Sequence, residues 1–149
     1  MFCRLLVAHL RDRAGAIARW TTQLKAGGTL LLDEIEDIRS DEPAFERYLS
    51  LAIEVVERAG GRLIAGPELA AMPDPPGTER ASATDVLVDV SAADAATIFA
   101  MNLRVLIESG ETDPRPELER ALAEVAERGG ASIHWRMRQV AFHRIATCL

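Results

Sequence analysis

A pair of glycines between two apolar segments constrains this sequence more than any other feature. Residues 14–24 carry apolar side chains at the three- and four-residue spacing of an amphipathic helix, and Gly27-Gly28 follows soon after. Glycine adopts the left-handed conformation of many helix ends without strain. Residues 29–32 then show no polar alternation, which is typical of a strand covered on both faces. This order predicts an open α/β sheet.

Acidic side chains follow the predicted strand directly. Asp33, Glu34 and Glu36 stand where its carboxyl end is expected. Open α/β sheets bind their ligands beyond the carboxyl ends of the strands. The sequence therefore places these residues near a candidate ligand site.

The rest of the chain continues to alternate helices and strands. Ser40 to Pro43 indicates a helix start, with a cap candidate, two acids and a proline, and Gly60-Gly61 indicates its end. Glycine and proline predict a loop over residues 66–77. The remaining expected elements are a strand over 84–90, a helix capped by Ser91, a helix over 113–128 and a two-sided strand over 132–143.

Length and charge limit the possible classes of protein. A chain of 149 residues suits one domain over residues 1–149 and is too short for two ordinary ones. Hydrophobic residues make up 48% and charged residues 27%, which indicates a globular protein. A net charge of -6 without a basic stripe argues against nucleic acid as a partner.

The first ten residues and the cysteines bear on the cellular compartment. The apolar start meets Arg11-Asp12-Arg13 too soon to span a membrane, and it lacks a signal-peptide cleavage site. We therefore expect a cytoplasmic protein without a membrane segment. For Cys3 and Cys148, free thiols are favoured over a disulfide. The three histidines are scattered, so no metal site is predicted.

Several motifs resemble the C-terminal portion of class I S-adenosylmethionine-dependent methyltransferases. Lys25-Ala26-Gly27-Gly28 stands where that family usually has Lys-Pro-Gly-Gly, and residues 99–104 and 135–140 are similar to segments of members that act on small molecules. The family's sheet has seven strands, the last inserted antiparallel. The matches are residues 2–4 to the tail of the fourth strand, 29–36 to the fifth, 84–90 to the sixth and 132–143 to the last. The resemblance implies a partial Rossmann-like methyltransferase sheet with flanking helices.

The same resemblance implies methyl transfer from S-adenosylmethionine to a small-molecule acceptor. The family holds this cofactor on a Gly-x-Gly-x-Gly turn after its first strand, and no glycine precedes Gly15 here. No cofactor-binding residue is therefore predicted. We expect a truncated methyltransferase, and we leave open whether it is active alone.

By position in that scheme, three residues border the point where donor and acceptor meet. The resemblance makes His9 a candidate catalytic base, and Arg4 and Glu34 candidate substrate-binding residues. Structural alternatives stay open for each: a polar helix end for His9, a surface ion pair for Arg4 and a solvated strand end for Glu34. For the basic stripe His134, Arg136 and Arg138, a solvated strand face is favoured over an anion site.

Two other functions remain possible. Without the family's first strands, the apolar edge of the strand at residues 29–36 would be open, so the chain could be a non-catalytic interaction or dimerisation module. A homo-oligomer could form through that exposed edge. A small enzyme of another class, using Glu34, His9 and His134, lacks a supporting nucleophile or metal pattern.

Overall fold

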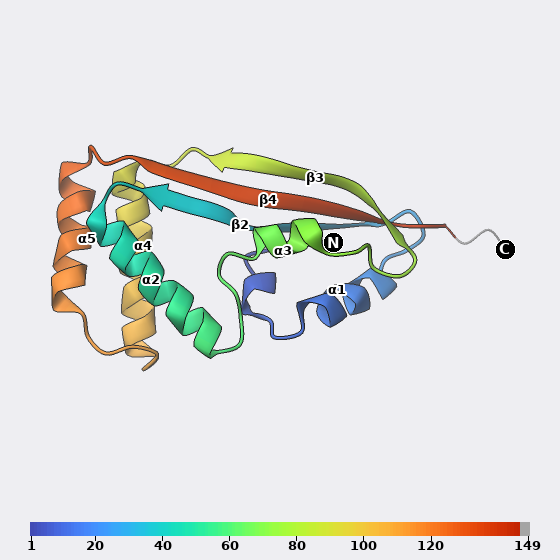
Figure 1. Ribbon diagram of the computed structural model, residues 1–149, viewed down its shortest axis with the longest axis horizontal. Helices are drawn as coiled ribbons and strands as arrows, with labels where there is room; N and C mark the ends of the chain where they lie inside the picture. The colour runs from blue at the N-terminus through green and yellow to red at the C-terminus, as the bar shows by residue number, and fades with distance from the viewer. Residues whose placement is uncertain (147–149) are drawn as a thin grey trace.

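The computed structural model describes residues 1–146, in which four strands form one sheet (Figure 1). The strands are β1 (Phe2–Arg4), β2 (Thr29–Ser40), β3 (Thr78–Val88) and β4 (Ile133–Arg144). Their order in the sheet is β1-β2-β4-β3. β1 is parallel to β2, whereas β4 is antiparallel to both β2 and β3. The α/β class and the antiparallel insertion of the final strand are thus confirmed.

Six helical segments in the described part of the chain flank this sheet. They are η1 (Val7–His9), α1 (Arg13–Thr22), α2 (Pro43–Arg58), α3 (Gly66–Ala71), α4 (Ala92–Glu108) and α5 (Pro116–Arg128). In Figure 1, α2, α4 and α5 stand together at one end of the sheet, and α1 and α3 lie toward the other. None of them is both long and apolar enough to cross a bilayer.

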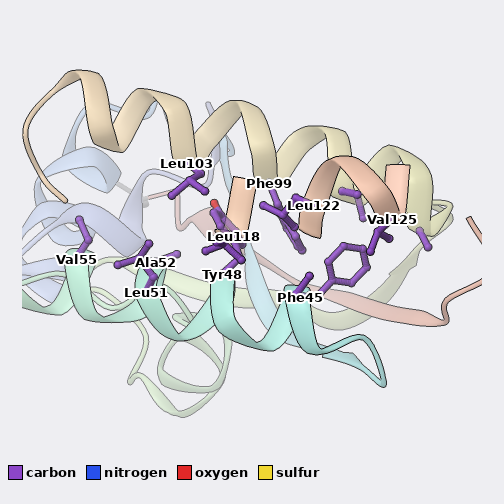
Figure 2. Packing of buried hydrophobic residues seen from close by; sticks show 14 residues of the cluster. Phe45, Tyr48, Leu51, Ala52, Val55, Phe99, Leu103, Leu118, Leu122 and Val125 are labelled. Atoms are coloured by element: carbon purple, nitrogen blue, oxygen red, sulfur yellow. The ribbon is translucent and has the colours of Figure 1, made fainter. Parts of the chain in front are cut away.

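The larger core lies among α2, α4 and α5 and is built around Phe99 (Figure 2). The Phe45 ring meets the Phe99 ring edge-on at a centroid distance of 5.1 Å, and the Tyr48 ring stacks on it at 4.4 Å. Ile133 and Trp135 of β4 pack against this cluster. Aromatic pairs in these geometries contribute about 0.5–1.5 kcal/mol beyond their buried area.

The smaller core lies at the other end of β4. Leu30 pairs with Phe142 and Leu32 with Val140 across β2 and β4, and all four side chains are fully buried. Trp135 and Phe142 are seven residues apart, so strand alternation places them on opposite faces of β4. Each end of this strand therefore buries a different face against a different group of helices.

Several predicted boundaries were wrong. β3 begins at Thr78, six residues before the predicted start at residue 84, and β2 continues to Ser40, because both strands pair with β4 along nearly its whole length. Part of the predicted 66–77 loop is α3, whose Leu69 is buried in the smaller core. Ser40 is not the cap of α2. The carboxylate of Glu42 accepts the Ala44 N–H instead.

The glycine turn that begins β2 has the expected conformation. Gly27 has a φ of 73°, and its N–H donates to the Arg144 carbonyl oxygen at 3.0 Å. The preceding helix, α1, ends earlier than predicted, at Thr22. Cys3 is buried in the smaller core, whereas Cys148 lies outside the described residues, so the prediction for that pair does too.

Candidate functional site

An apolar cavity of about 330 Å³ lies between η1, α2 and α4, beside the carboxyl-terminal half of β2. Its wall includes Ala8 and His9 from η1, Ile35 and Ile38 from β2, Tyr48, Leu49, Ala52, Val55 and Val56 from α2, and Ile98, Phe99, Asn102, Val105 and Leu106 from α4. Leu5, Leu63 and Trp135 complete the lining among the described residues. A concave, mostly apolar cavity with a few polar groups is the usual form of a small-molecule site.

The turn between β1 and η1 reaches the cavity through a strained residue. Leu5 has a φ of 54°, which residues other than glycine, asparagine and aspartate rarely adopt. Its N–H donates to the Asp33 carbonyl oxygen at 3.0 Å, which continues the pairing with β2. Such a conformation costs about 1–3 kcal/mol and concentrates at binding and active sites.

A buried carboxylate anchors η1 from below. Glu34 is 0% exposed, and its Oε1 accepts the Val7 N–H at 2.8 Å while its Oε2 accepts the Ala8 N–H at 3.4 Å. Burial raises the pKa of Glu34, and the two backbone hydrogen bonds oppose that rise. Because η1 carries Ala8 and His9 into the cavity wall, Glu34 positions one side of the cavity. The structural alternative of a solvated strand end is wrong for Glu34, because the residue is buried within β2. Its predicted contact with an acceptor stays a prediction.

The turn that follows α2 holds η1 from a second side. The Arg62 N–H donates to the Ala8 carbonyl oxygen at 2.6 Å. A Cβ on Gly61 would lie 2.4 Å from the same oxygen, which is closer than real Cβ atoms approach. Only glycine therefore fits here without a shift of the backbone. The path of η1 is fixed by β2 on one side and by the end of α2 on the other.

The three predicted site residues occupy different places. His9 is exposed, ends η1 and lies in the cavity wall. Arg4 is exposed on β1, outside the lining, and its Nε lies 3.3 Å from Oδ2 of the buried Asp33. This ion pair is the structural alternative foreseen for Arg4. The structure thus brings His9 into the cavity, Glu34 behind it and Arg4 to the neighbouring strand edge.

Sequence reasoning missed the polar groups on the opposite wall. Tyr48 of α2 is buried, which raises the pKa of its hydroxyl, and a hydrogen bond from Asn102 of α4 partly offsets the effect. The Nε1 of Trp135 is buried with no hydrogen-bond partner in the described part of the chain. The sequence did contain one indication: Asn102 is a polar residue among the apolar positions of its helix.

The basic stripe on β4 is divided: His134 is exposed, as expected for a solvated strand face, whereas Arg136 and Arg138 are paired with acids. The Arg136 guanidinium donates to both carboxylate oxygens of Asp37, at 2.9 and 2.6 Å, and lowers the pKa of that carboxyl group. The Nε of Arg138 lies 3.0 Å from Glu36 Oε2 and 3.0 Å from Asp85 Oδ1. Acids of β2 and β3 therefore neutralise both arginines.

No family model and no curated protein matches this sequence. Solved structures do match. The first is a methyltransferase candidate from Bacillus halodurans C-125, with a TM-score of 0.58, 12% identity, and coverage of 97% of this chain and 68% of that chain. This likeness shows the fold. The chain has a methyltransferase-like fold.

Two further structures are more distant. The [4+2]-cyclase SpnF has a TM-score of 0.41 and 15% identity over 97% of this chain and 48% of that chain. The phosphoethanolamine N-methyltransferase 2 of Haemonchus contortus, in complex with phosphomonomethylethanolamine and S-adenosylhomocysteine, has a TM-score of 0.40 and 11% identity over 97% and 33%. The chain thus spans about half and a third of these two proteins.

The described residues do not fit the cofactor site of the methyltransferase family. The glycines with positive φ are Gly27, Gly60, Gly77, Gly110, Gly129 and Gly130. None of them follows the carboxyl end of a parallel strand and opens a helix, as a nucleotide-binding glycine turn does. The carboxyl end of β1 leads instead into Leu5, Leu6 and η1. Residues 1–146 therefore supply a candidate small-molecule cavity without a dinucleotide-type cradle.

Proposed function

We propose that this chain binds a small-molecule methyl acceptor in the cavity between η1, α2 and α4, as part of S-adenosylmethionine-dependent methyl transfer. The observation that supports this function is the position of the cavity. It lies beyond the carboxyl end of β1 and beside that of β2 in a methyltransferase-like fold, where open α/β sheets bind ligands. His9 stands in its wall.

Each predicted site residue has a proposed part. His9 accepts a proton from the acceptor's nucleophilic group, a task for which imidazole is the commonest side chain. Arg4 binds polar groups of the acceptor that project past the strand edge. Glu34 holds η1 and so keeps His9 in position, because alignment of the reactants accounts for much of the acceleration in group transfer.

The cofactor needs residues other than those described. Because residues 1–146 form no glycine cradle, we propose that the chain is a truncated methyltransferase that is inactive unless the cofactor-binding part is supplied. Titration calorimetry tests this directly. The 149-residue protein should show no binding of S-adenosylhomocysteine at millimolar concentration. Clear binding would contradict this part of the proposal.

Variants made in the chromosomal gene test the proposed catalytic role of His9. The protein is isolated with everything that copurifies, and methylated products of a small-molecule panel are measured by mass spectrometry. His9→Ala should lower the rate by about 10²-fold. The matched control is His134→Ala, because His134 is also exposed but lies on β4 outside the cavity. No transfer by the unmodified preparation at saturating cofactor would overturn the proposed activity.

The predicted open edge of the strand at residues 29–36 was wrong, because β2 pairs with β1 on one side and with β4 on the other. The open edge is that of β1, and it is the observation that supports a second function. The Met1 carbonyl oxygen accepts the Leu31 N–H at 2.9 Å, and the Leu5 N–H donates to a carbonyl oxygen of β2. Because alternate residues of a strand point their N–H and C=O groups to opposite sides, those of Phe2 and Arg4 face away from the sheet. The Phe2 side chain is 60% exposed. We propose, as the alternative, a non-catalytic module that dimerises through this edge.

Light scattering after size exclusion distinguishes the alternative. A dimer at micromolar concentration that dissociates in Phe2→Lys would support it. The control is Leu87→Lys, because Leu87 is 61% exposed on β3 at the opposite edge of the sheet. A monomer at the same concentration would count against a dimerisation module.

A further inference from the structure

We infer that the ligand of the cavity is an uncharged aromatic molecule with one hydrogen-bond-accepting oxygen. As a statement about the methyl acceptor this rests on the proposed function, but binding can be measured without any cofactor. Three properties of the cavity wall carry the inference: its charge, its aromatic surface and the hydrogen-bonding amide of Asn102.

The wall offers a charged ligand no acidic or permanently cationic side chain, and the imidazole of His9 is the basic group in the described lining. Among the residues that the structure describes, the lining contains no aspartate, glutamate, lysine or arginine. The carboxylate of Glu34, behind the wall, is already engaged, since it accepts the Val7 and Ala8 N–H groups. A charge that leaves water needs a counter-charge or several hydrogen bonds, so an anion or a cation is disfavoured here.

The wall is aromatic on the side away from η1. Figure 2 shows Tyr48 and Phe99 between α2 and α4. Their rings are nearly parallel, with an interplanar angle of 19°, and the Phe99 ring lies 6.0 Å from that of Trp135. Flat rings pack well against such surfaces in offset or edge-on geometry. The volume of about 330 Å³ is at the lower end of the range for small-molecule pockets and suits a ligand of two fused rings.

The aromatic wall also carries a side chain that can hydrogen-bond a ligand. Asn102 lines the cavity, is exposed, and interacts with the Tyr48 hydroxyl group. Its amide has two N–H donors, so it can also donate to an oxygen of a ligand. A hydrocarbon of the same shape could not accept this hydrogen bond.

Three probes with one ring system separate these properties: 2-naphthol, 2-naphthoate and naphthalene. Binding to the 149-residue protein is followed by NMR on the methyl groups of Ile38 and Ile98 in the cavity, with Ile17 in the smaller core as the internal control. We expect 2-naphthol to shift only the cavity methyls. We expect 2-naphthoate to bind at least tenfold more weakly and naphthalene at least threefold more weakly.

Two variant pairs test the site. Ile98→Glu places a carboxylate in the wall and should weaken 2-naphthol binding at least fivefold, whereas Val86→Glu on β3 should not change it. Ile98 and Val86 are equally exposed, at 39% and 40%. Asn102→Leu should remove most of the preference for 2-naphthol over naphthalene, while Met101→Leu, on the same helix outside the lining, should keep it.

The outcomes separate the ligand class from the activity. Binding of 2-naphthoate as tight as that of 2-naphthol, or equal weakening by Ile98→Glu and Val86→Glu, overturns the inferred class even if methyl transfer is found. If 2-naphthol binds more tightly than 2-naphthoate and naphthalene but no methyl transfer is found, the inferred ligand class is supported and only the proposed activity is refuted.

Discussion

The carboxylate of Glu34 accepts the backbone N–H of Val7 at 2.8 Å, between residues 27 positions apart in the chain. Through this bond an interior residue of β2 determines the course of the turn after β1. That turn carries His9 to the cavity wall. The geometry of the candidate site therefore depends on a side chain that has no exposed surface.

Glu34→Ala should destabilise the protein by about 1–3 kcal/mol, because it leaves the buried Val7 N–H without an acceptor. Glu34→Gln should cost less, since the amide oxygen can still accept one of the two N–H groups. Urea denaturation followed by circular dichroism measures both. Equal stability of Glu34→Ala and the unmodified protein would show that the bond does not anchor η1.

The stability contributed by Glu34 should fall as pH rises. Burial holds the pKa of Glu34 above its ordinary value of 4.5, so above pH 4.5 the folded state retains a proton that the unfolded chain has lost. Melting temperatures of the unmodified protein and of Glu34→Gln are compared from pH 4 upward. We expect the unmodified protein to lose stability relative to the variant across this window. A constant difference would contradict the raised pKa.

Asp37 contributes with the opposite sign. The Arg136 guanidinium lowers the pKa of Asp37 below 3.8, so its contribution is present above that value and is lost only in stronger acid. The two carboxyl groups therefore act in separate pH ranges. The Glu34 experiment remains interpretable if measurements begin near pH 4.

Gly61→Ala should displace η1. Its Cβ would come within 2.4 Å of the Ala8 carbonyl oxygen, and a shift of well-packed backbone costs about 1–3 kcal/mol. Gly27→Ala is the matched glycine control. Its Cβ would meet no atom within 4 Å, so that variant loses about 1–2 kcal/mol through its φ of 73° alone. Only Gly61→Ala should move the amide NMR signal of His9.

Arg80→Ala should loosen the segment before β3. The Arg80 guanidinium donates to the carbonyl oxygens of Ala70, at 2.7 Å, and Met72, and it lies 5.4 Å from the centre of the Phe142 ring. Hydrogen exchange of the backbone amides over residues 69–74 should become faster, with a loss of about 1–3 kcal/mol in stability. Arg80→Lys should recover only part of it, because an ammonium group cannot donate in the same fork. If hydrogen exchange over residues 69–74 is unchanged in both variants, contacts other than those of Arg80 hold this segment in place.

The sequence predicted those elements whose side chains carry a pattern. The unbroken apolar run before Asp33 and the Ser91 cap of α4 were both recognisable, and the Ser91 side chain does accept the Asp94 N–H. The start of β3 was missed for a physical reason. Its residues after Thr78 are mostly exposed and are held by backbone pairing to β4, which leaves no alternation to read.

The site was only partly predictable. His9 and Glu34 were named from their places after predicted strand ends, and the structure joins them through η1. Tyr48 and Asn102 were not predicted as site residues, because a sequence pattern does not show that two helices approach each other around a cavity. Their meeting depends on how α2 and α4 pack, which is a tertiary property.

The insertion of β4 between β2 and β3 has a consequence for synthesis. Leu30 pairs with Phe142 and Thr78 with Arg144, so both long parallel strands leave the ribosome well before the strand that joins them. Pairings this distant in sequence form slowly, and unpaired strand edges attract other chains meanwhile. During translation, the nascent chain must keep two unpaired strand edges from aggregating until the residues that close the sheet have been made.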